Sequence, residues 1–396
     1  MSLKPLEGIV VLDLTRLLPG AVASMYLANF GAEVFKVEEP RQGDYARQMP
    51  PLIEGEGAYF RLTNCGKKSV AIDLKSPLGK ETFMRLAARA DVLIEGFRPG
   101  VMERLGLGYE QLRTHNERLI YAAVTGYGQY GPLASLAGHD INYISLAGLL
   151  ESNREAGGPP VIPGVQLADL VGGALQAVIG ILLALAARVR TGRGQLVDVS
   201  MQDGSLMLLV VPLAHLIATG RMPEPGGESL TGCFACYNVY EARDGRYVSV
   251  GALEPKFWAA LCRALECEPF IPDQFAEGER QRQIVSALAR IFKTRDAHEW
   301  FELLKSQDVC VTPVERVADL IHSEHLRERE MIVTRDDGAE GVIQQLGVSP
   351  KLSDTPGRLS GSAPPRLGQH TREALLWTGL SADELKELEL KQIIKT

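Results

Sequence analysis

An alternation of short apolar runs with helical stretches constrains the fold of this chain more than any other feature. The runs are rich in Val and Ile, as in GIVVLDLT and KKSVAIDL, and they span residues 8–15, 31–40, 67–74, 91–97 and 118–128. The sequence between two of them predicts a helix from Pro77 to Ala90. Buried strands that alternate with helices of about 10–15 residues indicate an α/β fold with a parallel sheet.

The carboxyl ends of the predicted strands carry polar and aromatic residues. Ligands of a parallel sheet bind beyond these ends, in the crevice that the following loops form. We therefore expect the binding site along the edge that holds Thr15–Arg16, Glu38–Glu39, Asp73–Lys75, Phe97–Arg98 and Tyr127.

The 396 residues are enough for two or three domains of ordinary size. In the second half, residues 237–253 predict a β-hairpin around an Asp-Gly turn, and SADELKEL predicts a final helix with Ser381 as its N-cap. We predict a large α/β domain over 1–200, a helix and a linker over 201–230, a small α+β domain over 231–330, and a return linker with a C-terminal segment that packs on the large domain over 331–396.

Composition and charge are typical of a soluble globular protein and argue against a nucleic-acid-binding one. Apolar residues make up 45% of the chain and charged residues 23%, without the bias of disordered or fibrous sequences. The formal net charge is −7, whereas nucleic-acid binding depends on a basic surface. This charge leaves room for a small polyanionic ligand that is bound by a few local Arg and Lys residues.

The longest apolar run, VGGALQAVIGILLALAA at 171–187, predicts a buried core helix rather than a membrane span. It is shorter than the roughly 20 residues that a span needs, and it contains Gln176 and internal glycines. The N-terminal apolar run is interrupted by Asp13 and Arg16, unlike a secretory signal, and the final IIKT is not a peroxisomal address. These features predict a cytoplasmic protein without membrane contact.

Six cysteines in a chain of this length do not indicate a disulfide framework. Cys233 and Cys236 have a metal-like spacing, but Cys262 and Cys267 are spaced more widely, and no histidine lies close by. Structural zinc sites usually have tighter paired spacings. We therefore predict no metal site and interpret these thiols as buried or idle.

The segment GYGQYG at 126–131 matches the glycine pattern of dinucleotide-binding loops and follows a predicted strand. Pro132 comes next, the residues after it do not predict a capped helix, and the expected acidic residue about 20 positions later is absent. The segment therefore predicts a glycine-rich turn at a strand end rather than a dinucleotide site.

His139 and Asp169 are two residues whose surroundings allow acid–base chemistry. His139 lies in AGHDINYISLAG, and Asp169 lies in ADLVGG, where the long apolar helix begins. Neighbouring glycines permit close approach of a ligand, and the two side chains have different reference pKa values. Each residue also has a plain structural interpretation, because a lone His in an apolar run is usually packed and an Asp at a helix start is usually an N-cap. The residues alone leave both interpretations open.

Over nearly its whole length the sequence resembles the class III CoA-transferase family. The resemblance is carried by GIVVLDLTRLLPG, GAEVFKVEEP, SVAIDLKSPLGKE, ADVLIEGFRPGVMERLGLG, GYGQYGP, GRGQLVDVSMQDG, LSDTP and LGQHT. Within the family, AGHDINY and GALEPKFW are similar to the α-methylacyl-CoA racemase branch. The resemblance implies an interlocked homodimer in which each chain is a ring, with a large Rossmann-like domain and a small α+β domain joined by two linkers.

The resemblance also implies roles for individual residues. His139 and Asp169 would be the two proton-transfer groups, and Glu254 would come from the partner subunit and support the histidine. Without the resemblance, Glu254 would be an exposed residue before a proline at a helix start. The acyl-CoA substrate would contact a larger set: Ile72, Asp73, Leu74, Lys75, Gly96, Phe97, Arg98, Arg104, Gly138, His139, Asp140, Ile141, Asn142 and Tyr143.

Two arginines in that set would hold the phosphates of the substrate. A guanidinium binds phosphate oxygens bidentately, so Arg98 and Arg104 are candidates for the diphosphate or the 3′-phosphate. The alternative interpretation is that both are solvated surface arginines. One position departs from racemase relatives, which can carry an arginine after the second strand where this chain has Glu39. Arg41 would then substitute, or binding on the adenine side would be weaker.

The implied reaction is inversion of the α-carbon of a 2-methylacyl-CoA thioester. A proton leaves one face and another returns to the opposite face, so two groups must flank the carbon, each within about 3 Å of its proton. The enolate intermediate needs a hydrogen-bond donor, for which the backbone N–H of Asp140 is the candidate. Gly138 would admit the ligand, and Tyr143 would line its channel. This chemistry requires no metal, flavin or nicotinamide cofactor.

Two other functions stay open. Asp169 could instead be a nucleophile that forms a covalent intermediate and passes CoA to another carboxylic acid. Transferases of the family commonly have a glycine-rich loop near the small-domain hairpin and lack this histidine, whereas here GALEP occupies that region. A non-catalytic CoA-binding scaffold would leave His139 and Asp169 without a purpose. We therefore expect a racemase, and the sequence does not identify its acyl group.

Overall fold

The computed structural model describes residues 4–154, 157–222, 226–227, 229–336, 342–360 and 362–396. The chain forms two compact units. The first contains residues 1–149, 163–210 and 324–396, and the second contains 150–162 and 211–323. Residues 150–162 thus group with the second unit, which the sequence does not indicate.

The first unit is built on a seven-stranded sheet with the order β14-β5-β2-β1-β6-β7-β8. Every strand runs parallel to its neighbours except β14, which pairs antiparallel with β5. The prediction of an α/β fold with a parallel sheet is therefore confirmed. The strands are β1 (Val10–Asp13), β2 (Glu33–Glu38), β5 (Lys68–Ile72), β6 (Val92–Glu95), β7 (Ile120–Thr125), β8 (Leu196–Ser200) and β14 (Ile394–Lys395).

Both faces of this sheet are buried. Successive residues of a strand point to opposite faces, so neighbouring side chains pack in different clusters. In β1, Leu12 packs in one hydrophobic cluster and Val11 in another. Burial on both faces explains why the strands are continuous apolar runs rather than alternating ones. The helices that contribute to the first cluster are α3 (Pro77–Ala87), α4 (Val101–Leu105), α5 (Tyr109–Arg113), α16 (Thr371–Trp377) and α17 (Ala382–Leu390), and those that contribute to the second are α1 (Leu18–Asn29) and α8 (Gln176–Thr191).

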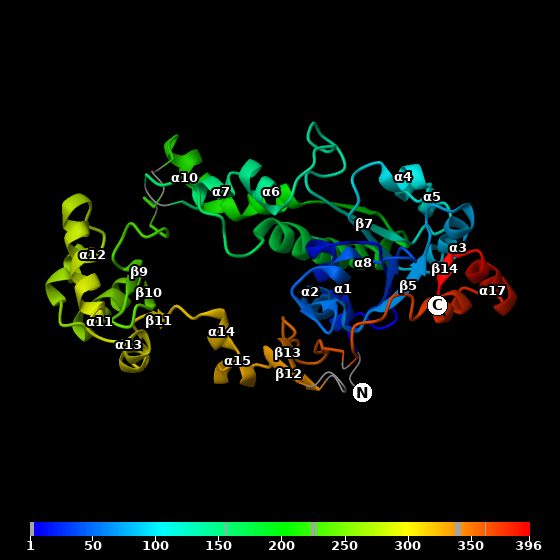
Figure 1. Cartoon of the computed structure of the whole chain (residues 1–396). Helices are drawn as coiled ribbons and strands as arrows, with labels where there is room; N and C mark the ends of the chain where they lie inside the picture. The colour runs from blue at the N-terminus through cyan, green and yellow to red at the C-terminus, as the bar shows by residue number, and fades with distance from the viewer. Residues whose placement is uncertain (1–3, 155–156, 223–225, 228, 337–341, 361) are drawn as a thin grey trace. The chain divides into compact units, whose positions relative to one another are not determined.

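The C-terminal end of the chain packs beside the early strands. Figure 1 shows α17 and β14 (red) next to α3 and β5, although they come from opposite ends of the chain. Ser381 caps α17, and its hydroxyl accepts the N–H of Glu384 at 3.2 Å. The final helix and its cap are as the sequence predicts.

The order of strands places a topological switch point at β1. The chain runs from β1 outward through β2 and β5 on one side of the sheet. It then returns to the other side of β1 and runs outward through β6, β7 and β8. The loops after β1 and β6 therefore diverge, which opens a crevice at the carboxyl ends of these two strands.

The long apolar run forms η2 (Ala168–Leu175), a π-helix, and continues without a break into α8. The prediction of a core helix holds for one face, where Ala177, Ile181 and Ala184 are buried against the sheet. On the other face Leu183 is 66% exposed and Val189 86% exposed. By length and composition alone, the described residues contain two helical stretches able to cross a membrane, Ala168–Thr191 and Met201–Thr219.

Shorter elements complete the first unit. The strands β12 and β13 pair antiparallel within the stretch 331–396, for which the sequence predicts a return linker and a C-terminal segment. The elements are η1 (Tyr45–Gln48), β3 (Leu52–Ile53), β4 (Glu56–Gly57), α2 (Ala58–Asn64), α6 (Asp140–Leu146), α9 (Met201–Leu206), η3 (Met207–Leu209), α15 (Glu324–Glu328), β12 (Ile332–Asp336) and β13 (Val342–Leu346), while α7 (Leu149–Ser152) and α10 (Val210–Thr219) lie where the chain passes between the units.

The second unit is a small α+β structure with its own core. The predicted hairpin is present, since β9 and β10 pair antiparallel and Gly245 of the turn has a φ of 73°. Trp258 is buried in the core, and the rings of Phe292 and Trp300 lie 5.3 Å apart between centroids. Its elements are β9 (Tyr237–Glu241), β10 (Tyr247–Gly251), α11 (Pro255–Ala264), η4 (Glu268–Asp273), α12 (Gly278–Phe292), α13 (Ala297–Leu304), β11 (Val311–Pro313) and α14 (Val317–Leu320).

Candidate functional site

Two cavities open at the switch point of the sheet, beyond the carboxyl ends of β1 and β6. Their volumes are about 290 Å³ and about 240 Å³. Both are lined by Thr15 and Arg16 after β1 and by Phe97 after β6. We call them the anchor cavity and the proton cavity, and their shared walls make them two parts of one site.

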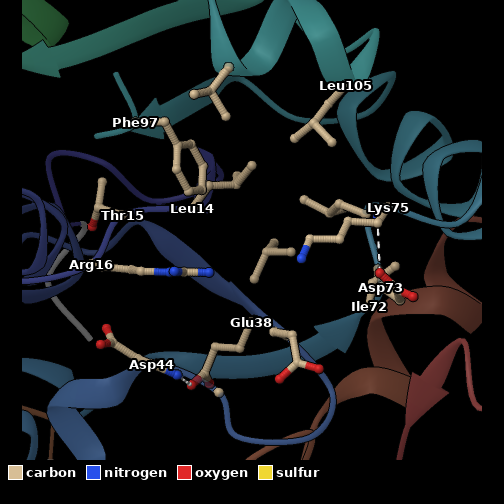
Figure 2. Close-up of a pocket in the computed structure, with 15 residues that line it drawn as sticks. Leu14, Thr15, Arg16, Glu38, Asp44, Ile72, Asp73, Lys75, Phe97 and Leu105 are labelled. Carbon is tan, nitrogen blue, oxygen red and sulfur yellow. Dashed lines mark hydrogen bonds between the residues drawn. The ribbon is translucent and has the colours of Figure 1, made fainter. Parts of the chain in front are cut away.

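The anchor cavity combines an apolar wall with two cationic side chains. Ile72, Phe97 and Leu105 supply apolar surface from the ends of β5 and β6 and from α4. Arg16 and Lys75 point into the cavity from opposite walls, as Figure 2 shows. The guanidinium carbon of Arg16 also lies 5.7 Å from the ring centroid of Phe97. Such a cavity suits a ligand with a flat apolar part and negatively charged groups.

A buried ion network holds the loops of the anchor cavity in place. The Nζ of Lys36 donates to the backbone oxygen of Thr15 at 3.1 Å and pairs with Asp44 at 2.8 Å, so it joins the loop after β1 to the loop after β2. The Nζ of Lys67 lies 3.3 Å from Asp13. Burial disfavours the charge of Asp13, but Lys36 and Lys67 outweigh it and hold the pKa at about 2.

The loop after β2 contains Glu39, the position at which the family resemblance led us to expect an arginine. Glu39 lines the anchor cavity, and its Oε2 accepts the N–H groups of Arg41 and Gln42 at 3.0 and 2.8 Å. Arg41 is exposed and does not line the cavity. The arginine that the structure places in the anchor cavity is Arg16. The expected binding edge included Arg16, because it directly follows the first strand, but the set of CoA contacts that the family resemblance implies did not.

Glu95 lies beneath the loop that both cavities share. It is the last residue of β6, is 4% exposed, and its Oε2 accepts the N–H of Phe97 at 2.7 Å. Burial raises the pKa of its carboxyl to about 7, and the nearby charge of Glu103 adds to this. The side chain that fixes the position of Phe97 therefore changes its charge near neutral pH.

The proton cavity holds both predicted proton-transfer residues. His139 is the N-cap of α6, and its backbone N–H donates to Oδ1 of Asn142 at 3.0 Å, which leaves the exposed imidazole at the start of the helix. Asp169 lies in the first turn of η2. Burial and, to a smaller extent, the charge of Asp140 raise the pKa of Asp169 to about 6, although His139 acts in the opposite direction.

Tyr143 closes one side of the proton cavity. Its hydroxyl donates to the backbone oxygen of Gly138 at 2.5 Å, and its ring meets Tyr127 edge-on with centroids 5.1 Å apart. A Cβ on Gly138 would lie 2.8 Å from the Tyr143 ring, and one on Gly126 would lie 2.3 Å from it. These two glycines therefore allow Tyr143 to pack against the backbone. The other glycines of GYGQYG, Gly128 and Gly131, have positive φ values of 83° and 96°, so local packing and turn geometry account for the motif's glycines.

The structure brings most of the predicted site residues to the two cavities. The residues that line them are Ile72, Asp73, Leu74, Lys75, Gly96, Phe97, Arg98, Gly138, His139, Tyr143 and Asp169. Arg104, Asp140, Ile141 and Asn142 line neither cavity. Glu254 belongs to the second unit, where it is the N-cap of α11 and its backbone oxygen accepts the N–H of Phe257 at 2.9 Å.

No cysteine lines either cavity. Cys236, Cys262 and Cys267 are buried in the core of the second unit, and the six cysteines, all among the described residues, form no disulfide bond. Over the described part of the chain, no group of three or more His, Cys, Asp or Glu side chains is arranged to hold a metal ion.

Known proteins resemble the chain from end to end. The model of a family described as CoA-transferase family III matches residues 6–371. An α-methylacyl-CoA racemase of Mus musculus is 38% identical over 99% of this chain and 98% of its own length. A succinyl-CoA:glutarate CoA-transferase of Mus musculus is 32% identical over 94% of this chain and 86% of its own length. The crystal structure of a CAIB/BAIF family protein from Brucella suis has a TM-score of 0.83 at 29% identity, over 96% of this chain and all of that one.

Proposed function

The chain belongs to CoA-transferase family III, and within this family we propose that it is a racemase that inverts the α-carbon of a 2-methylacyl-CoA thioester. The observation that carries the proposal is that His139 and Asp169 line one cavity. Similarity to α-methylacyl-CoA racemases supports the choice of reaction, with 38% identity to the mouse enzyme and 35% to the human one.

The chemistry follows from the two side chains. When neutral His139 removes the α-proton from one face, protonated Asp169 supplies a proton to the other face, and the roles reverse for the opposite enantiomer. The raised pKa of Asp169, about 6, keeps a useful fraction protonated near neutral pH, which an exposed Asp with an ordinary pKa of 3.8 does not do. Proton transfer by a positioned group of this kind contributes roughly 10²- to 10⁴-fold to a rate.

The enolate that forms between the two transfers carries negative charge on the thioester oxygen. The backbone N–H of Asp140, in the first turn of α6, is the proposed donor, because N–H groups at a helix start have no acceptor within the helix. The CoA part would occupy the anchor cavity, with Arg16 and Lys75 facing its phosphates. Arg98, which lines the proton cavity, would contact the pantetheine side of the diphosphate.

Transfer of CoA to another acid is the second candidate function. Asp169 would then attack the thioester carbonyl and expel CoA as thiolate, which leaves an anhydride between Asp169 and the acyl group. The thiolate would attack the Asp169 carbonyl and release the first acid as a carboxylate, and the acceptor carboxylate would take up CoA by the same two steps in reverse. The similarity to a succinyl-CoA:glutarate CoA-transferase favours this alternative. The transferase reaction does not use His139, whereas racemisation uses both His139 and Asp169 of the proton cavity.

We also propose that the protein is a cytoplasmic, interlocked homodimer in which Glu254 of the partner subunit supports His139. Large apolar side chains of α8 that are exposed in the single chain, among them Leu183 and Val189, support the proposal, because a second copy of the chain could bury them. Ile217 on α10 is 76% exposed as well.

Solvent deuterium distinguishes the two reactions. A 2-methylacyl-CoA of one configuration, incubated in D₂O without an acceptor acid, should gain deuterium at the α-carbon and invert. His139→Ala should abolish inversion and leave slow exchange on the face that Asp169 serves, and Asp169→Ala should give the mirror result with the other enantiomer. His115→Ala, which removes an exposed imidazole on another part of the unit, is the matched control.

A transferase gives a different pattern. Asp169→Ala would lose CoA transfer, His139→Ala would keep most of it, and neither the wild type nor the variants would exchange the α-proton. If the wild type moves CoA to a labelled carboxylic acid at a useful rate and shows no α-deuteration, the racemase assignment is wrong.

A further inference from the structure

A hydrogen bond joins the two segments that carry the proposed proton-transfer residues. Oδ1 of Asp140, the first residue of α6, accepts the backbone N–H of Asp169 at 3.0 Å, although the two are far apart in the sequence. His139 directly precedes Asp140 and is the N-cap of the same helix. The side chain of Asp140 therefore fixes the start of η2 relative to the start of α6.

Asp140 does not line the proton cavity, whereas His139 and Asp169 do. Its carboxylate can therefore act on the reaction only through a neighbour. We propose that Asp140 is the positioning residue of the proton-transfer pair: its carboxylate holds Asp169 opposite His139 and places a fixed negative charge beside it. This inference rests on the proposed racemisation.

The charge of Asp140 has a direct consequence for Asp169. Burial is the main cause of the raised pKa of Asp169, and Asp140 is the second. The other titratable groups that act on this carboxyl are His139, which opposes the shift, and two tyrosines, Tyr143 on α6 and Tyr59 on α2. Burial raises the pKa of both tyrosines, to about 12 for Tyr143, so they are neutral at pH 7.

A charge beside Asp169 serves reversible proton transfer. A racemase must take a proton from either enantiomer, so its two acids must release protons over a similar pH range. An imidazole ordinarily has a pKa of about 6.5, and a carboxyl near 6 matches it far better than one near 4. Asp140 thus brings the carboxyl of Asp169 toward the range in which an imidazole works.

Two substitutions separate the charge of Asp140 from its hydrogen bond. Asp140→Asn keeps a side-chain oxygen that accepts the N–H of Asp169 but removes the charge. It should move the acidic limb of the kcat/KM profile for racemisation to lower pH by about half a unit or more, because a neighbouring like charge raises the pKa of a carboxyl. Asp140→Ala removes both, so it should show the same movement and a further loss in kcat of about tenfold, since the N–H of Asp169 loses its acceptor.

Glu110→Gln is the matched control, because it removes an exposed carboxylate on α5 that pairs with Arg113. Its pH profile should coincide with that of the wild type. Profiles of both Asp140 variants that also coincide with the wild type would reduce Asp140 to a helix cap and overturn the inference. If Asp140→Ala does not fold, Asp140→Asn alone decides.

Failure of this inference is distinct from failure of the proposed function. Wild-type protein that exchanges the α-proton, together with Asp140 variants whose pH profiles do not move, refutes the role of Asp140 and leaves the racemase standing. Wild-type protein without any α-exchange refutes the racemase, and the role of Asp140 in proton transfer falls with it.

Discussion

The Glu95→Gln variant should gain stability relative to the wild type as the pH rises from acidic to alkaline values. Glu95 is buried at the end of β6, where its carboxylate accepts the N–H of Phe97 at 2.7 Å. A Gln side chain has an oxygen in the same place, so it can keep this hydrogen bond. It differs from Glu95 mainly because it stays neutral at every pH.

The sign and the size of the effect follow from the pKa. Burial raises the pKa of Glu95 from 4.5 to about 7, so between these values the folded protein holds a proton that the unfolded chain has released. The stability that this proton contributes is fully present below pH 4.5 and is lost as the pH rises through 7. At about 1.4 kcal/mol for each pH unit between the two values, the loss totals about 3 kcal/mol.

Urea denaturation at several values between pH 5 and pH 8, followed by circular dichroism, measures this loss. The unfolding free energy of Glu95→Gln minus that of the wild type should grow by about 2–3 kcal/mol across this range. The control is Glu117→Gln, an exposed position, whose difference from the wild type should stay constant. A difference for Glu95→Gln that is equally flat would refute the argument, because the buried carboxyl would then cost nothing to ionise.

Two further predictions concern the ligand and the subunits. Arg98 lines the proton cavity, whereas Arg104 lines neither cavity. Arg98→Ala should therefore weaken binding of a CoA thioester by about tenfold at low salt, and Arg104→Ala should weaken it less. At high salt the affinities of both variants should approach that of the wild type, because salt screens the ion pairs. Titration calorimetry measures this, and unchanged affinity at low salt would assign both to the solvated surface. An interlocked dimer should not dissociate on dilution, so sedimentation at nanomolar concentration should give twice the chain mass of 43.2 kDa. A monomer there would remove Glu254 from the proposed site.

The fold was predictable because its signals are local. Apolar runs of the right length, separated by capped helical stretches, identify β1, β2, β5, β6 and β7 within a few residues at each end. The pairing of β12 with β13 was not predictable. The two strands lie in a segment rich in Gly, Pro and Ser, and they show no alternation of apolar and polar residues. The pairing of β14 with β5 joins opposite ends of the chain, and two residues carry too little pattern to reveal it.

The site was predictable only in part. The rule for parallel sheets pointed to the correct edge, and Thr15, Arg16 and Phe97 do line both cavities there. That rule does not say which strand-end side chains turn inward, so it named Arg16 without giving it a role. Arg104 was expected from the family resemblance alone, and it lines neither cavity. The bond between Asp140 and Asp169 depends on how α6 packs against η2, a long-range contact that neither segment encodes by itself.

The loops of the site share one construction, in which a carboxylate at or just after a strand end accepts a backbone N–H a short distance further on. Asp13 accepts from Thr15 at 2.9 Å after β1, and Asp73 accepts from Lys75 at 3.0 Å after β5. Glu95 accepts from Phe97 after β6 in the same way. Charged acceptors form stronger hydrogen bonds than neutral ones, so these carboxylates stiffen the loops that hold the ligand.

This construction has an electrostatic cost that differs from loop to loop. Carboxylates at these strand ends would repel the phosphates that the anchor cavity is proposed to hold. Arg16 and Lys75, which face into this cavity, would offset the repulsion. At β1 the buried lysines compensate the charge of Asp13 and keep its pKa near 2. At β6, burial and the nearby charge of Glu103 disfavour the carboxylate of Glu95 and raise its pKa to about 7. As the pH falls, the loop of Phe97 therefore loses its charged acceptor long before the loop of Thr15 does, and the boundary between the two cavities is the part of the site that responds to pH first.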